Sequence, residues 1–208
     1  MQPATLAQII AADPIADMQA AIVATLSRLL PGVTIVGHPG KADVSELVSK
    51  SIVKSPGVGV GWSRIRETAI ADGSYNALVE WVAYIVAEPT IVANKRVEME
   101  RIGYAIGGQL LKILSDITVS TWGRPGVGPV ETVSPSPELK PLFTVKDQDK
   151  GTVYYTVSWL QPIFDIGRSE FPAPIGRADP EAGTIEYAEG ASIQDMAPWL
   201  PGEITNDA

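Results

Sequence analysis

The stretch SPGVGVGWSRIRETAIADGSYNALVEWVAYIVAE, residues 55–88, decides the fold of this chain. Its second half, from residue 75, is rich in aromatic and β-branched residues and predicts a long strand. Its first half alternates glycine with valine as far as Trp62, with the period of two that is typical of a strand. Between the halves, Asp72 and Gly73 form a dipeptide that favours a tight turn. The stretch therefore predicts a long β-hairpin.

The glycine run also raises the alternative of a phosphate-binding loop. A dinucleotide fingerprint requires G-x-G-x-x-G between a strand and a helix, but Trp62 stands where the third glycine should fall. The residues that follow lead to the Asp-Gly turn, and no Gly-Lys-Ser/Thr sequence occurs. We favour a strand with one bare face at Gly57, Gly59 and Gly61, which another chain segment can approach closely. A small nucleotide-binding enzyme is the weaker alternative.

Two main amphipathic helices are predicted on either side of the hairpin. In DPIADMQAAIVATLSRLLPG, residues 13–32, apolar residues recur every three or four positions, and Asp13 and Pro14 suit a helix start. The same spacing runs through NKRVEMERIGYAIGGQLLKILSD, residues 94–116. There Gly103 and Gly107 share a face that another backbone can approach. Shorter helices are expected over residues 4–12 and 43–53.

Two further strands and a long loop complete the predicted body. VTIVG, residues 33–37, is β-branched and bounded by turn residues, and residues 151–166 alternate in a strand pattern. Residues 121–141 contain five prolines and predict a loop. His38 lies in a G-H-P-G sequence without a second histidine or any cysteine in the chain. We therefore expect it to be a surface turn residue rather than a ligand or a base.

The charge of the chain is concentrated near its C-terminus. Residues 165–208 contain nine acidic and two basic residues and so carry −7 of the total charge of −8. Two regions are predicted: an α/β (α+β) domain over residues 1–166 and an extended acidic arm over residues 167–208. The domain should hold a small mixed or antiparallel sheet with the long hairpin, packed by the two main helices. Neither region has the clustered basic surface of a duplex-DNA binder.

The composition offers little for catalysis. With no cysteine and one histidine among 208 residues, we predict no catalytic, cofactor-binding or metal-binding residues and therefore no enzyme. No apolar run reaches the length of a membrane span, and the N-terminus lacks the basic opening of a secretory signal. A soluble protein of the cytoplasm, or of a particle assembled there, is expected. The candidate functional residues are instead those of a subunit interface: Gly57, Gly59, Gly61, Trp62, Arg64, Arg66, Phe171 and Trp199.

Two of these candidates, Arg64 and Arg66, lie two positions apart on one strand. They can pair with acidic residues of a neighbouring subunit, such as those of the arm, or form an ordinary solvated strand face. Phe171 and Trp199 are apolar anchors spaced along the acidic arm.

The order of these elements resembles the tail terminator proteins of long-tailed bacteriophages, in the branch of the Mu-like contractile phages. The likeness spans roughly residues 14–166. It is carried by LLPGVTIVG, SPGVGVGWSRIRET, YNALVEWVAYIVAE, LLKILSD and, most tellingly, the late aromatic strand TVYYTVSWLQPIFDIG. The N-terminal extension and the acidic arm depart from the compact outline of that family.

The resemblance implies a structural virion protein of the neck, assembled in the host cytoplasm. Its subunits would form a hexameric ring that caps the tail tube and joins the tail to the head-side connector. The implied partners are the tube protein, the sheath protein of a contractile tail and the connector, with no cofactor and no membrane. DNA would only pass through the lumen. Another neck, head-completion or baseplate protein is the alternative within the same class.

Overall fold

The computed structural model describes residues 3–40, 53–71, 74–133, 135–142, 151–164, 166, 176–179 and 184–187. The chain divides into two units, Met1–Arg168 and Ser169–Ala208. The predicted arm, with Phe171 and Trp199, lies largely outside the described residues, as does the helix expected over residues 43–53. In the second unit, strands β8 (Gly176–Asp179) and β9 (Thr184–Tyr187) pair in antiparallel fashion.

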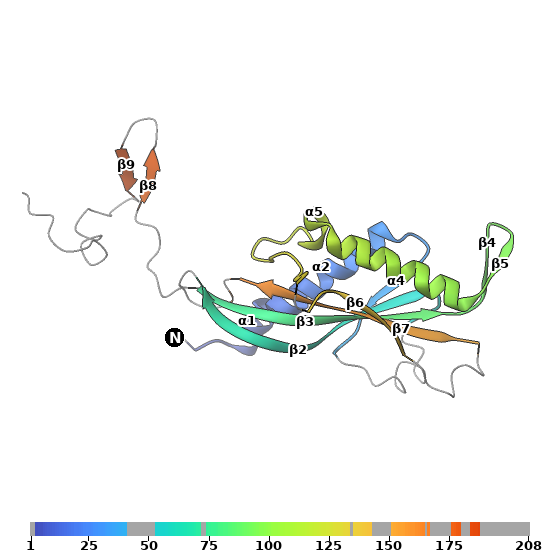
Figure 1. Ribbon diagram of the computed structural model, residues 1–208. Coiled ribbons are helices and arrows are strands. Elements are labelled where there is room, and N and C mark those ends of the chain that lie inside the picture. The colour runs from blue at the N-terminus through green and yellow to red at the C-terminus, as the bar shows by residue number, and fades with distance from the viewer. Residues whose placement is uncertain are drawn as a thin grey trace, which may run out of the picture. The chain divides into compact units, whose positions relative to one another are not determined.

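The first unit is an α+β domain built on a five-stranded sheet, as predicted (Figure 1). The strand order is β1-β2-β3-β7-β6, and only the β1–β2 pair is parallel. The strands are β1 (Thr34–Gly37), β2 (Gly57–Ala71), β3 (Ser74–Ala87), β6 (Glu138–Leu142) and β7 (Val153–Ile163). The helices are α1 (Leu6–Ala11), α2 (Pro14–Leu29), α4 (Met99–Ser115) and α5 (Ile117–Ser120).

The predicted hairpin forms the centre of the sheet. β2 and β3 pair from Gly57 opposite Val86 to Ala71 opposite Ser74, with two irregularities in register between Trp62 and Glu67. Asp72 and Gly73, the predicted turn, lie outside the described residues. β3 is covered on its other edge by β7, the predicted aromatic strand. The structure thus places the long strand and the late strand side by side.

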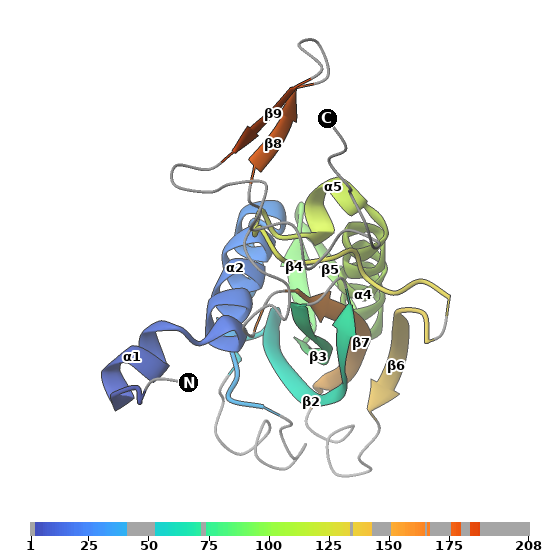
Figure 2. The same cartoon turned by 90° about the vertical axis from the view of Figure 1, so that its left-hand side faces the viewer.

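Helices α2 and α4 cover one face of the sheet and enclose the core (Figures 1 and 2). Helix α2 begins as predicted, because the Asp13 carboxylate accepts hydrogen bonds from the main-chain N–H groups of Ile15 and Ala16 at 2.9 and 3.2 Å. The buried core side chains are drawn from both helices and from β2, β3 and β7; they include Met18, Ile22, Leu26, Val58, Val60, Trp81, Leu110 and Val157.

Three predicted boundaries differ from the structure. Helix α4 begins at Met99 rather than near residue 94, because Thr90–Val92 (β4) and Lys95–Val97 (β5) form a small hairpin there. The turn between them places Ala93 and Asn94 at φ of 48° and 62°. The predicted loop over residues 121–141 ends in β6, an edge strand that tolerates Pro141. The face of Gly103 and Gly107 receives side chains, those of Tyr155 and Leu139, and not another backbone.

Candidate interaction surfaces

The bare face of the glycine run is filled by the same chain. A Cβ atom at Gly61 would lie 2.8 Å from the carbonyl oxygen of Gly40, and one at Gly59 would lie 2.9 Å from Val53 Cγ2. A Cβ atom at Gly57 would meet Val53 and the carbonyl oxygen of Lys54. The expectation of a neighbouring subunit at these three glycines is therefore corrected. The segments on either side of the β1–β2 connection occupy that face instead.

His38 is buried, so the prediction of a surface turn residue is wrong. Its side chain lies beside the ring of Tyr84, with centroids 6.0 Å apart in an edge contact, and its Nδ1 is 2.7 Å from the carbonyl oxygen of Gly40. Its own carbonyl oxygen accepts a hydrogen bond of 2.6 Å from Gln19 Nε2, which also donates to Val60 at 2.7 Å. One amide thereby links α2 to the residue that follows β1 and to Val60 of β2.

The remaining interface candidates differ in how far they are buried. Trp62 is half-buried against the main core. Arg64 is exposed and forms an ion pair of 3.1 Å with Glu80 across the hairpin, within the same chain. The pair contributes little free energy, because the Arg64 side chain is 61% exposed and water screens its charge. The side chain of Arg66, like Phe171 and Trp199, lies outside the described residues.

A buried polar network that sequence reasoning missed centres on Gln161. This residue of β7 is fully buried. Its Oε1 accepts from Trp122 Nε1 at 2.8 Å and Trp159 Nε1 at 3.2 Å, while its Nε2 donates to the carbonyl oxygens of Ser120 and Gly128 at 2.6 and 2.7 Å. Every polar atom of the amide has a hydrogen-bond partner, so its burial avoids the cost of an unpaired polar group. The network fixes the loop after α5 against the sheet.

Two titratable groups shift for structural reasons. Burial raises the pKa of Tyr155, and the hydroxyl of Tyr104 and the charge of Glu100 raise it further, so its phenol stays neutral. Hydrogen bonds from the side chain and main chain of Thr118 lower the pKa of Asp116, which caps α5. No group of three or more potential metal ligands occurs among the described residues.

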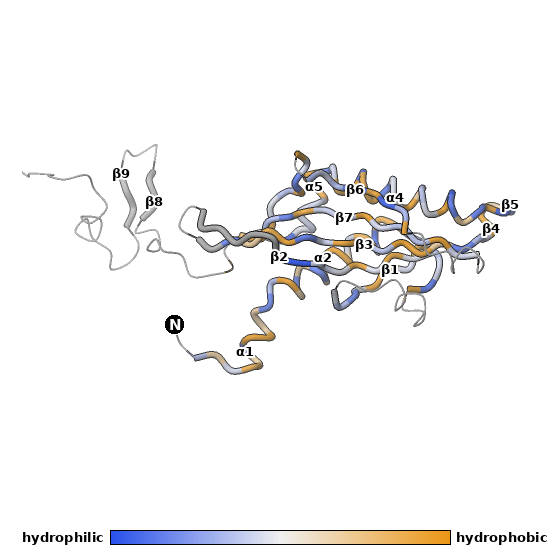
Figure 3. The backbone as a smooth tube through the Cα atoms, turned by 60° about the horizontal axis from the view of Figure 1, so that its bottom comes forward, coloured by the Kyte–Doolittle hydropathy of each residue, from blue (hydrophilic) through white to orange (hydrophobic). Residues whose placement is uncertain are grey.

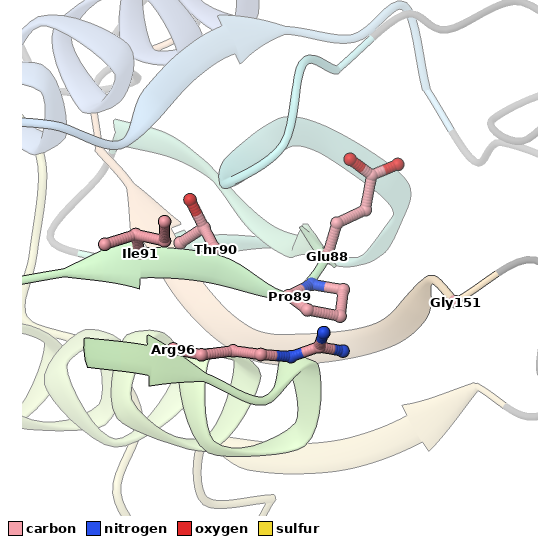
Figure 4. Close-up of a pocket in the computed structure, with 6 residues that line it drawn as sticks. All are labelled: Glu88, Pro89, Thr90, Ile91, Arg96 and Gly151. Carbon is pink, nitrogen blue, oxygen red and sulfur yellow. The ribbon is translucent and has the colours of Figure 1, made fainter. Parts of the chain in front are cut away.

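An open pocket of about 460 Å³ lies beside the β4–β5 hairpin (Figure 4). Its lining residues are Glu88, Pro89, Thr90, Ile91, Arg96 and Gly151. The Arg96 guanidinium pairs with Glu98 at 3.0 Å, and Glu88 accepts from Thr152 Oγ1 at 3.3 Å. Figure 4 shows the Glu88 and Arg96 side chains on different sides of Pro89. Both charges are thus engaged within the chain and do not converge on a common point.

Exposed apolar side chains gather on two small elements that project from the domain. Helix α1 exposes Leu6 by 72%, Ile9 by 58% and Ile10 by 66%, and it buries none of its residues. The β4–β5 hairpin exposes Ile91 by 74% and Val92 by 53%. Figures 1 and 3 place the two elements toward opposite ends of the first unit, with apolar colour on both in Figure 3. Neither surface was predicted, since short apolar segments are usually buried.

One helical segment among the described residues, Leu6–Leu29, is long and apolar enough to cross a membrane by length and composition alone. It is divided into α1 and α2 by the cap at Asp13. Met18, Ile22 and Leu26 on its second part are at most 1% exposed and form part of the core. We therefore interpret α2 as a core helix and α1 as a separate surface element.

Comparison of the sequence with known proteins leaves the family open. No protein-family model and no curated protein matches the chain.

Proposed function

We propose that this chain is a structural subunit that assembles with copies of itself, and specifically a tail terminator of a long-tailed bacteriophage. The observation that carries the proposal is the placement of exposed apolar side chains on α1 and on the β4–β5 hairpin, two elements that project from the body. Large apolar groups exposed together are typical of surfaces that other proteins cover.

The arrangement suits a subunit of a ring that is closed above and below by other rings. Such a subunit must contact its neighbours at its sides, and it must contact the tail tube and the head-side connector at its two ends. β3 has 14 residues and spans about 45 Å, with the β4–β5 hairpin following at one end and α1 lying toward the other (Figure 1). The order of helices and strands supports the same proposal, through the resemblance to tail terminators described above.

In this proposal the protein has no catalytic role and acts by ring formation at the neck of the virion. The ring, taken as a hexamer from the resemblance, halts growth of the tail tube and presents a surface to the connector. The sheath protein of a contractile tail is a further partner.

Two measurements test the proposal together. The purified chain should sediment as a closed oligomer, and particles assembled without it should carry tails of irregular length that are not joined to heads, as seen by electron microscopy. A monomeric protein, together with normal tails in its absence, would refute the assignment. Labelling at the baseplate end of the particle would instead favour a baseplate protein.

A further inference from the structure

Two segments cover the outer edge of β7. β6 pairs with β7 from Tyr154 to Ser158, and the main chain of residues 126–131, here named the edge strap, pairs with the remainder. Three main-chain hydrogen bonds join the strap to β7: Phe164 N to the carbonyl oxygen of Gly126 at 2.7 Å, Gly128 N to that of Pro162 at 3.0 Å, and Glu131 N to that of Leu160 at 2.9 Å. The strap and β6 therefore form the margin of the sheet on this side.

Side chains hold the edge strap against β7. Gln161 Nε2 donates to the carbonyl oxygen of Gly128 at 2.7 Å. Arg124, just before the strap, forms an ion pair of 2.7 Å with Asp17 of α2. The approach is close, because a Cβ atom at Gly128 would lie 2.6 Å from Pro162 Cγ. The strap is thus fixed in place by both the core and a helix.

The sequence of β7 makes this cover necessary. Residues 153–160, VYYTVSWL, contain no charge, no proline and no glycine. Uncharged segments of high β-propensity pair readily with further strands when an edge of the sheet is exposed. The margin outside β7 therefore decides whether another chain can extend the sheet.

In β6, a position that faces outward from the sheet lacks a hydrogen-bond donor. Along an antiparallel strand, residues that bond to one neighbour alternate with residues that face the other side. The carbonyl oxygens of Leu160 and Pro162 face the strap, so the alternation directs Thr156 toward β6. Its partner Lys140 then faces β7, and Pro141, the next residue, faces outward. Proline has no main-chain N–H, so Pro141 offers no donor to a further strand.

The edge strap repeats this feature. Gly126 and Gly128 bond to β7, so Val127 between them faces outward. The next outward position by the same alternation is Pro129, which again has no N–H. Both Pro129 and Pro141 are exposed. The margin is therefore poor in the donors that a sheet needs for extension.

The length and charge of β6 act in the same direction. The strand has five residues. Its Lys140 and Glu138 form an ion pair of 2.7 Å, and both side chains are more than half exposed. Short edge strands, charged side chains and prolines each discourage the addition of a further strand.

We propose that the margin formed by the edge strap and β6 closes this side of the sheet to strand addition, and that Pro129 and Pro141 block pairing with a second copy of the chain. The inference goes beyond the proposed self-assembly, because it states that copies do not join by extension of the sheet across this margin. It holds equally for a chain that is a monomer.

Replacement of both prolines by valine tests the block directly. Pro129→Val together with Pro141→Val restores two outward N–H donors at exposed positions and adds residues of high β-propensity. In sedimentation velocity, this variant should form larger species at a concentration about tenfold lower than the unaltered chain does. Infrared spectroscopy should show intermolecular β-sheet in those species. The matched control is Pro125→Val together with Pro135→Val, two exposed prolines outside the paired segments, and it should sediment like the unaltered chain.

A disulfide tests whether the edge strap stays closed. Val127 and Ile163 lie opposite each other as a pair that exchanges no hydrogen bonds. The Cα atoms of such a pair are about 4.5 Å apart, within the range of a disulfide. The chain has no cysteine, so Val127→Cys together with Ile163→Cys should form a disulfide within one molecule. The oxidised chain should then sediment like its own reduced form.

Three results would overturn the inference. The first is a Pro129→Val, Pro141→Val variant that sediments like the control at every concentration. The second is a variant that has lost the near-ultraviolet circular dichroism of the unaltered chain at low concentration, since the prolines would then maintain the fold instead of blocking pairing. The third is a Val127→Cys, Ile163→Cys chain that forms no disulfide, or that assembles only when it is reduced. A monomeric unaltered chain would refute the proposed function, but the comparison of the valine variants would still decide this inference.

Discussion

Replacement of Gln161 by methionine should destabilise the domain strongly. Methionine has a similar length but forms no comparable hydrogen bonds, so four buried groups lose their partner: the indole N–H groups of Trp122 and Trp159 and the carbonyl oxygens of Ser120 and Gly128. Each unsatisfied group costs about 1–3 kcal/mol. Even at the lower end, the expected loss is about 4 kcal/mol. That is a large part of the 5–15 kcal/mol that is typical of a domain.

Urea unfolding at a fixed protein concentration measures this loss, since assembly makes stability depend on concentration. Tryptophan fluorescence follows the network itself, and circular dichroism follows the whole fold. Ser158→Ala is a suitable control, because this half-buried residue of the same strand forms no side-chain hydrogen bond with the described residues. It should cost well under 1 kcal/mol. A Gln161→Met variant as stable as this control would refute the assigned role of the network.

Three further predictions concern the glycine face of β2, the β4–β5 turn and the end of β1. Gly61→Ala should lower the urea midpoint, because its Cβ would lie 2.8 Å from a backbone oxygen. The control is Gly108→Ala in α4, whose Cβ meets nothing within 4 Å, and it should raise the free energy of unfolding by about 1 kcal/mol. Equal effects of the two variants would contradict the close approach at Gly61. Ala93→Gly should stabilise by about 0.5–1 kcal/mol, since alanine at φ of 48° is strained, and an unchanged melting temperature would count against the turn. Gln19→Leu removes the two hydrogen bonds by which α2 holds the end of β1. Hydrogen exchange at the main-chain N–H of His38 should therefore become at least tenfold faster. An unaltered exchange rate would show that α2 does not hold that strand.

The sequence allowed the centre of the fold to be predicted because its signals there are local. The aromatic and β-branched composition of β3, the alternation in β7 and the Asp13–Pro14 start of α2 each depend on neighbouring residues alone. β6 was not predicted, because it forms only by pairing with β7, which is distant in sequence. Its proline also argues against a strand, since proline is tolerated only in an edge strand. The start of α4 was misplaced because the β4–β5 turn uses Ala93 and Asn94 instead of a standard Asn-Gly pair.

The surfaces were harder to predict, because they depend on contacts distant in sequence. Only the parallel pairing of β1 with β2 brings His38 and Gly40 against Gly61, so the covering of the glycines could not be foreseen. Gln161 did leave a signal: it shares the alternation that buries Val157 and Trp159, and a glutamine on that face requires buried partners.

The mass of the unaltered chain in solution tests the central proposal most directly. Sedimentation equilibrium over a wide range of micromolar concentrations should give a closed oligomer, at six times the 22.1 kDa of the chain if the ring is a hexamer. A mass of 22.1 kDa at every concentration would contradict the account of this protein as a self-assembling subunit.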